Sequence, residues 1–274
     1  MARTVARDGE APADGEPDPG LVAAQRARSR AALENLSPRR GSLDRLVWLV
    51  VRAGFALVGW RVRASGYDRL PRDAAGRAVP CVVAVAPHRG WTDPFLLLLT
   101  WPRDAPRLAW FGDARTMARS GWRRRLLPRL GMVPIPADAT PAAVREHLAD
   151  ARTVLGRGCG LVVFPEKGPP SAPGRTRTIA RGAAWLAAAG GAPLVPVAIG
   201  GFLETGLGTR YRLEVLTPLP PPALGPTTAA GIRAARATTD ALRGALDPAV
   251  ARLEAATRAE NGRRPLPGLR RLFR

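Results

Sequence analysis

The clearest candidates for chemistry are one histidine and one aspartate, His88 and Asp93, in the stretch APHRGWTDPF. His88 follows the apolar run CVVAVAP, so it is expected where a strand ends and the chain turns toward a helix. In open α/β sheets, ligands bind at this carboxyl edge. A carboxylate five residues away can hold one imidazole nitrogen so that the other acts as a general base. The pair therefore predicts proton transfer at a strand end.

Asp93 has a second interpretation, because Pro94 follows it. An aspartate at the N-cap with proline at the first helical position is a strong helix-start signal. Spacing alone leaves both interpretations open. The other histidine, His147, lies among charged residues in the helical segment AAVREHLADARTVL, and we expect it on a solvated helix face.

A second chemical candidate is the glutamate in LVVFPEKGPPSAPGRTR, which also contains the chain's only lysine, Lys167. Glu166 follows the strand-like run from Leu161 to Phe164. If this strand neighbours the one that leads to His88, Glu166 projects toward the same edge of the sheet. It could also bond backbone amides in its own turn, and the two roles are compatible.

The two cysteines, Cys81 and Cys159, each stand just before an apolar run. They belong to no C-x-x-C or metal-spaced set, and the chain has only two histidines. A disulfide is allowed by the count, but buried free thiols in a reducing compartment are the preferred interpretation. We expect no metal site.

The elements that must position these residues alternate between short apolar strands and helix-period segments. Runs that are apolar on both faces and separated by helices indicate a mostly parallel sheet flanked by helices, an α/β fold. The expected strands are 82–86, 107–111, 132–135, 161–164 and the run PLVPVAIGG. The expected helices are 94–101, 141–155 and 180–191, followed by one or two amphipathic helices up to about residue 258.

The termini differ in character from this central part. Residues 1–41 mix proline, glycine and both charge signs without an apolar run, which indicates a disordered lead-in and no signal peptide. Residues 42–260 are expected to form one domain, and 261–274 a short basic tail.

The segment 43–63 contains an apolar run with Trp48 and Trp60 near its ends and arginine flanks. It is too short to span a bilayer, which takes about 20 residues. Such a composition is typical of a helix in the membrane interface, and a buried core helix is the alternative.

The formal net charge of +20 implies attraction to polyanions. The stretch GWRRRLLPRLG and the tail LRRLFR pair apolar residues with arginines, as expected at an anionic membrane surface. Because nearly every basic residue is arginine, no single arginine indicates function by its type. A nucleic-acid-binding protein would share the charge, but no helix-turn-helix or RNP-type pattern is present.

The order of the motifs resembles the glycerolipid acyltransferase family from about residue 43 to 217. PHRGWTDP matches its H-x4-D signature, and Gly131, Val133 and Ile135 resemble its second motif. VVFPEKG resembles the third motif, F-P-E-G, and the Val-Pro pair at 195–196 resembles the fourth.

The resemblance implies that His88, oriented by Asp93, removes a proton from a glycerol-backbone hydroxyl that attacks an acyl thioester. It requires no covalent acyl-enzyme and no cofactor beyond acyl-CoA or acyl carrier protein as co-substrate. The implied acceptor is a lysophospholipid, 1-acyl-sn-glycerol-3-phosphate, and the implied location is the cytoplasmic face of the cell membrane, peripheral or monotopic. The implied substrate-binding residues are Gly131, Glu166, Lys167, Gly168, Arg175 and Arg177.

Two departures from the family pattern concern arginines that the family associates with the acceptor's phosphate. Ala137 stands where the second motif closes with arginine, and Pro169 stands where the third has it. Either Lys167 or Arg175 takes over the phosphate, or the acceptor is another hydroxyl-bearing lipid. An inactive lipid-binding relative is a further alternative.

Overall fold

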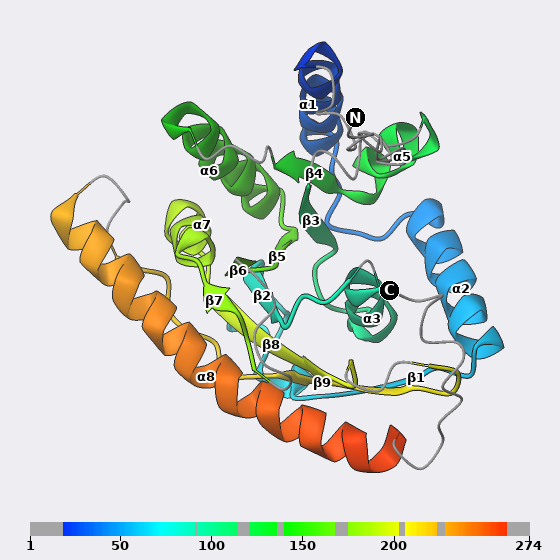
Figure 1. Ribbon diagram of the computed structural model, residues 1–274. Coiled ribbons are helices and arrows are strands. Elements are labelled where there is room, and N and C mark those ends of the chain that lie inside the picture. Colours follow the sequence, from blue (N-terminus) through cyan, green and yellow to red (C-terminus); the bar gives the residue numbers. More distant parts are fainter. Residues whose placement is uncertain are drawn as a thin grey trace, which may run out of the picture.

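The structure is a computed structural model, and it describes residues 19–90, 92–113, 121–135, 140–167, 175–202, 206–223 and 228–261. A seven-stranded sheet forms its centre, in the order β1-β9-β8-β2-β5-β3-β4 (Figure 1). All neighbouring strands are parallel except β8 and β9. The strands are β1 (Arg61–Ser65), β2 (Val82–Ala86), β3 (Leu108–Asp113), β4 (Met132–Ile135), β5 (Gly160–Val163), β8 (Leu194–Gly200) and β9 (Arg210–Val215).

Helices cover both faces of this sheet, so the fold is α/β with a mostly parallel central sheet, as the sequence predicted. The α-helices are α1 (Pro19–Glu34), α2 (Ser42–Leu57), α3 (Asp93–Thr100), α5 (Gly121–Leu126), α6 (Pro141–Gly156), α7 (Gly182–Gly190) and α8 (Ala229–Asn261). Two 3₁₀ turns, η1 (Tyr67–Arg69) and η2 (Pro128–Leu130), precede β2 and β4. A separate two-stranded ribbon pairs β6 (Glu166–Lys167) with β7 (Thr178–Ile179).

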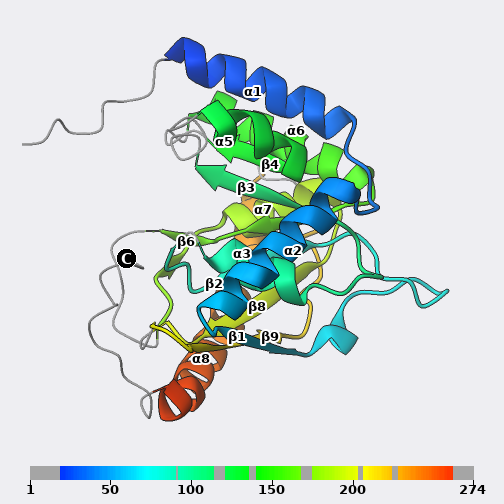
Figure 2. The ribbon, with the colours of Figure 1, turned by 90° about the vertical axis from the view of Figure 1, so that its right-hand side faces the viewer.

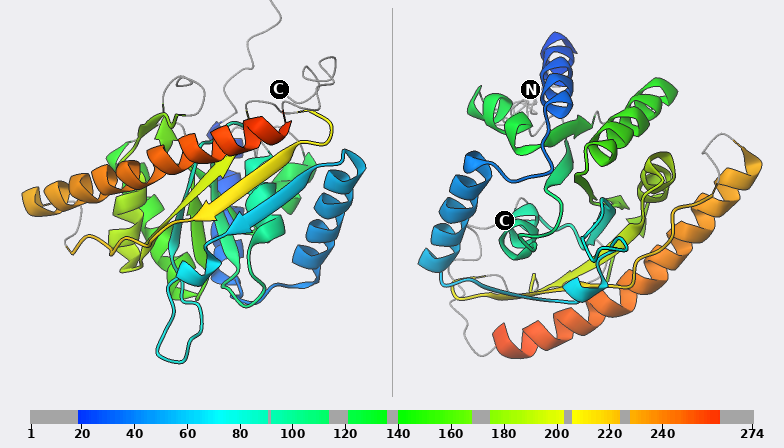
Figure 3. Two further views of the ribbon diagram at one scale, coloured as in Figure 1. Left: turned by 90° about the horizontal axis from the view of Figure 1, so that it is seen from below. Right: turned by 180° about the vertical axis from the view of Figure 1, so that it is seen from behind.

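The central strands divide the core into two layers because their side chains alternate between the faces. β2, β5 and β8 are buried along their whole length. One layer joins the sheet to α6, α7 and α8, and the other joins it to α2 and α3. Figure 3 shows α8 lying across β8 and β9 on the face away from α2.

The prediction that residues 1–41 form a disordered lead-in is wrong from residue 19 onward. Residues 19–34 form α1, which lies over α5, α6 and β4 (Figure 2). Its Gln25, Ser29 and Leu33 are buried, and Arg26 forms an ion pair with Glu146 of α6. The local sequence is charged and polar, but partners distant in the chain stabilise the helix. Residues 1–18 and the basic tail from 262 lie outside the described residues.

The prediction of one helix over 43–63 holds only for its first part. α2 ends at Leu57, and β1 begins at Arg61. Trp60 is not interfacial: it is buried, its ring contacts Phe55 edge-on, and its Nε1 donates to the carbonyl of Gly206 at 2.6 Å. No helix within the described ranges is long and apolar enough to cross a membrane. At the other end, the amphipathic segment forms a single helix, α8.

Candidate functional site

His88 and Asp93 lie together just beyond the carboxyl end of β2, the central strand of the sheet. Their Nδ1 and Oδ2 atoms are 2.7 Å apart. The His88 side chain is 41% exposed, whereas the Asp93 side chain is fully buried. Since a carboxylate only accepts, Nδ1 carries a proton in this contact, and in the neutral imidazole Nε2 keeps its lone pair.

Asp93 is the first residue of α3, and its carboxylate does not cap that helix. The same Oδ2 also accepts from the backbone N–H groups of Arg89 at 2.7 Å and Gly90 at 3.0 Å. The carboxylate of Asp93 therefore holds residues 88–90, called the His88 loop below, in place. Thr92 occupies the N-cap position of α3. This arrangement selects the histidine-orienting interpretation of Asp93 over the helix-capping one.

Two residues from the β5 side of the sheet fix His88 from its other side. The ring of Phe164 stacks on the imidazole, with centroids 4.1 Å apart and an interplanar angle of 22°. Glu166 accepts from the backbone N–H of His88 through Oε2 at 3.0 Å. β2 and β5 are parallel neighbours, so Glu166 does reach the edge at which His88 lies.

Glu166 also connects residues 175–177, called the third-motif segment below, to this edge. Its Oε1 accepts from the backbone N–H of Arg177 at 2.8 Å, next to the β6–β7 ribbon. Ala180 donates its N–H to the carbonyl of Pro165 at 2.7 Å. Both of the roles that the sequence left open for Glu166 are therefore compatible with its position: it bonds backbone amides, and it lies beside His88.

Four cationic residues surround this edge. Lys167 is exposed on β6, Arg175 is exposed, and Arg177 is half-buried. Arg89, which the sequence analysis did not single out, donates from Nη2 to the carbonyl of Arg175 at 2.7 Å and so joins the His88 loop to the third-motif segment. Gly168, Ala137 and Pro169 lie outside the described residues. The region thus combines a histidine–carboxylate pair with several positive charges.

Gly131 does not belong to this region. It precedes β4, at the amino edge of the parallel strands, and adopts φ 81° as the C-cap of η2. An added Cβ would come within 3.3 Å of the Ala109 backbone. Its glycine identity is explained by this left-handed conformation and close approach, and the structure does not bring it to His88.

The cysteines lie apart from this chemistry. Both are free and buried, as predicted. Burial raises the pKa of Cys81 to about 12 and that of Cys159 to about 11, so neither thiol gives a thiolate nucleophile near neutral pH. Within the part of the chain that the structure describes, no group of three or more His, Cys, Asp or Glu side chains could hold a metal ion. His147 on α6 is half-buried against the ring of Phe111 and is therefore not on a fully solvated face.

Phe164, like Arg89, was missed as a neighbour of His88, although it begins the F-P-E motif. Its position at the end of the strand-like run was a usable signal, because it follows β5 at the edge of the sheet where His88 follows β2. Arg89 carries no comparable signal, since an arginine is common everywhere in this sequence.

Comparisons with known proteins bear on the family to which the chain belongs. No curated protein matches the sequence. Among solved structures, the chain is similar to the crystal structure of the 1-acyl-sn-glycerophosphate acyltransferase PlsC from Thermotoga maritima, with 16% identity and a TM-score of 0.49 over 82% of this chain and 94% of that one. The family model described as "Acyltransferase" matches residues 61–200, more than half of the chain, and includes β2, the His88 loop, Glu166 and β8. This chain therefore belongs to the acyltransferase family.

Proposed function

We propose that the protein transfers a fatty acyl group from acyl-CoA or acyl carrier protein to the free hydroxyl of 1-acyl-sn-glycerol-3-phosphate, giving phosphatidate. The observation that carries this proposal is the 2.7 Å contact between His88 and Asp93 at the carboxyl end of β2. It supplies an oriented general base at the edge where α/β sheets bind their ligands.

In the proposed reaction, Nε2 of His88 accepts the proton of the acceptor hydroxyl. The oxygen of this hydroxyl attacks the carbonyl carbon of the thioester at the same time. The C–O bond forms, the C–S bond breaks, and His88 returns the proton to the departing thiolate. Asp93 holds the imidazole in the required tautomer and stabilises the imidazolium. The route needs no protein nucleophile, which agrees with the burial of both thiols.

The positive charges supply the binding site for the acceptor's phosphate. Arg89, Lys167, Arg175 and Arg177 belong to the two segments that Glu166 and Arg89 hold together. A phosphate can be held by a lysine point charge or by a bidentate arginine, so this cluster replaces the two arginines missing from the motifs.

The proposed membrane contact is the outer face of α2. Four large apolar side chains lie at helical spacing on this side of the helix and are exposed. They are Leu46 (57% exposed), Leu49 (56%), Val50 (62%) and Leu57 (89%). Arg52 lies over the ring of Trp48, with its guanidinium carbon 5.2 Å from the centroid. An apolar face beside arginines fits a helix lying in an anionic leaflet, and this supports the proposal of a peripheral protein at its lipid substrate.

The test is an acyl-transfer assay on the purified full chain, with acyl-CoA and acyl carrier protein as donors and lysolipids with and without a phosphate head as acceptors. Mass spectrometry identifies the products. We expect phosphatidate from the wild type and a loss of about 10²–10⁴-fold in kcat/KM for His88→Ala. His147→Asn, which changes the chain's other histidine, is the matched control and should retain activity. Full activity in His88→Ala would rule the mechanism out.

Lys167→Ala tests the phosphate site separately. It should raise KM for the phosphate-bearing acceptor several-fold and leave the acceptor without phosphate unaffected. Equal rates on both acceptors in the wild type would instead indicate a lipid acceptor that carries no phosphate.

A further inference from the structure

The C-terminal helix α8 lies outside the residues that the family model matches, which end at Gly200. It nevertheless contacts the sheet closely, and three of its polar residues face inward: Asp247, Glu254 and Asn261. They are spaced seven residues apart, so they lie in a row along one face of the helix at intervals of about 10 Å. Each one binds a different segment of the domain.

Asp247 binds the third-motif segment. Its carboxylate accepts from the hydroxyl of Thr176, whose side chain is buried between α8 and that segment. Thr176 stands between Arg175 and Arg177, two of the three arginines of the proposed phosphate site. The next residue, Arg177, donates its backbone N–H to Glu166, and Glu166 accepts from the backbone of His88. A continuous set of contacts therefore runs from α8 to the proposed general base.

Glu254 binds the segment that follows β8. This carboxylate is 4% exposed and accepts from the backbone N–H groups of Gly201 at 3.1 Å and Phe202 at 3.2 Å. β8 is the parallel neighbour of β2, with Ala198 beside Ala86, so residues 201–202 leave the sheet at the edge where His88 lies. The ring of Phe202 is packed against Tyr211, 5.6 Å between centroids.

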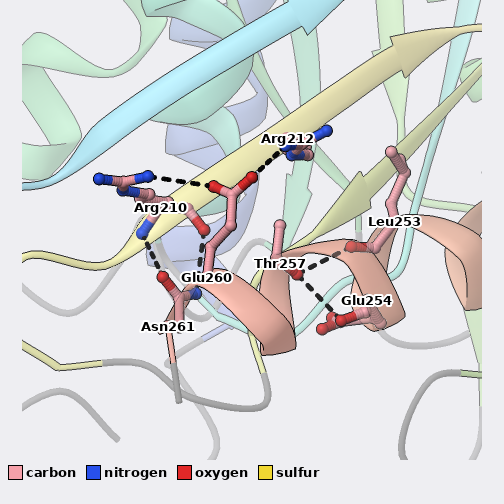
Figure 4. A network of polar contacts seen from close by, with 7 residues as sticks. All are labelled: Arg210, Arg212, Leu253, Glu254, Thr257, Glu260 and Asn261. Carbon is pink, nitrogen blue, oxygen red and sulfur yellow. Dashed lines mark hydrogen bonds and ion pairs between the residues drawn. The ribbon is translucent and has the colours of Figure 1, made fainter. Parts of the chain in front are cut away.

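Asn261 completes the row at the start of β9 (Figure 4). Its side-chain amide accepts from the backbone N–H of Arg210 at 2.9 Å and donates to its carbonyl at 3.1 Å. The neighbouring Glu260 forms ion pairs with Arg210 and Arg212. These two bonds to the backbone of Arg210 fix the position of α8 along the sheet. They thereby fix the positions of Asp247 and Glu254 relative to the segments that they bind.

We propose that Asp247 and Glu254 are positioning residues of the acyl transfer, which set the third-motif segment and the segment after β8 relative to His88. This inference rests on the proposed function. Burying the carboxylate of Glu254 carries a desolvation cost that an apolar side chain of similar size would avoid. Here that cost is offset by bonds to the backbone of Gly201 and Phe202, in the segment that leaves the sheet at the edge where His88 lies.

The first test separates positioning from stability at Asp247. In Thr176→Val and Asp247→Ala the contact is lost, and we expect KM for the lysophosphatidate acceptor to rise about tenfold while KM for the acyl donor stays within about twofold. Thr176→Ser keeps the hydroxyl donor and Asp247→Asn keeps an acceptor oxygen, so both should retain wild-type kinetics. Asp240→Ala removes an exposed carboxylate of the same helix and is the matched control.

The second test uses the different geometry at Glu254. Glutamine has one acceptor oxygen, and its NH₂ group would face a backbone N–H, so Glu254→Gln should behave as a loss variant, unlike Asp247→Asn. Amide hydrogen exchange gives a readout that needs no activity. We expect faster exchange at Arg177 in Thr176→Val and at Gly201 and Phe202 in Glu254→Gln, with Thr176→Ser unchanged.

The outcomes are distinguishable. A fall in kcat with unchanged acceptor KM and a lower melting temperature would assign these residues a purely structural role and overturn the proposal. Unchanged exchange in the loss variants would also overturn it. A wild type that transfers no acyl group to any acceptor would refute the proposed function, and the exchange measurements would still decide whether α8 holds the two segments in place.

Discussion

The helices α2 and α8 cover opposite faces of the sheet and distribute their side chains in opposite ways. α2 leaves the apolar side chains of Leu46, Leu49, Val50 and Leu57 exposed. α8 buries polar side chains, among them Glu254, Thr257 and Asn261, in addition to its apolar ones. An ordinary surface helix would show neither feature to this extent.

The two helices differ in what their unusual side chains contact. The polar groups of α8 bond to backbone within the domain. Among the described residues, nothing covers the exposed apolar side chains of α2. The helix is nevertheless firmly held: Asp44 pairs with Arg107 at 3.0 Å near its start, and Gly208 donates to the carbonyl of Val58 beyond its end. A fixed helix with an outward apolar face fits the membrane contact proposed above, whereas the buried polar groups of α8 bond within the domain.

The largest expected effect removes the outward apolar face of α2. We expect the triple variant Leu46→Gln, Leu49→Gln and Val50→Gln to bind vesicles of phosphatidylglycerol and phosphatidylcholine about 100-fold more weakly than the wild type in a flotation assay. The estimate follows from about 1 kcal/mol of membrane burial for each half-exposed side chain. Ile232→Gln, which changes an exposed apolar residue of α8, is the control and should bind normally. Unchanged binding of the triple variant would show that α2 is not the membrane contact.

The next effect concerns how closely α8 approaches the sheet. A Cβ added to Gly200 would lie 2.6 Å from the backbone carbon of Leu253, so Gly200→Ala forces the helix and strand apart. We expect the free energy of unfolding in urea to fall by about 1–3 kcal/mol. Gly244→Ala, on the same helix but with nothing within 4 Å of the added Cβ, should not destabilise the protein. Equal stability of Gly200→Ala and the wild type would mean that α8 docks more loosely than described.

Local sequence predicted the elements whose signal is local. β2, β5 and β8 are apolar runs buried on both faces, and α6 begins at the expected residue with the hydroxyl of Thr140 accepting from the N–H of Ala143. β9 was missed although RYRLEV alternates charged and apolar residues, which is the pattern of a strand with one buried face. α1 was missed because its stability depends on contacts with β4, α6 and η2, which are distant in the chain.

The residues of the candidate site also differ in whether local sequence reveals them. His88, Asp93 and Glu166 could be identified because motif order and strand ends place them. Asp247 and Glu254 could not, since their partners lie 71 and 53 residues away along the chain. Only the packing of α8 against the sheet brings them together with their partners, and an amphipathic pattern does not reveal that the buried position 254 holds a carboxylate.

The two thiols give a probe for each face, because Cys81 belongs to the core layer under α2 and Cys159 to the layer of α8. Burial raises the pKa of Cys81 from 9.0 to about 12, and that of Cys159 to about 11, where Arg107 partly offsets the burial. The folded protein therefore keeps protons that the unfolded chain releases above pH 9. Each thiol's contribution to stability is complete below pH 9 and is lost as pH rises toward its folded pKa, by about 1.4 kcal/mol per pH unit.

Urea unfolding measured from pH 8 to pH 11 tests this effect. The free energy of unfolding should fall less steeply with pH in Cys81→Ala than in the wild type. Identical slopes would contradict the burial of this thiol.

The smallest effect is of opposite sign and returns to α2. Gly54 lies inside this helix, on the side of Val50 and Leu57, and an added Cβ would meet nothing within 4 Å. Because glycine costs a helix interior about 0.5–1 kcal/mol relative to alanine, Gly54→Ala should raise the free energy of unfolding by that amount. Vesicle binding should stay equal or strengthen slightly, since the added methyl group extends the apolar face. A loss of stability at Gly54 would mean that another protein surface packs closely there in solution, and a second copy of the chain would then be the partner of α2 in place of the membrane.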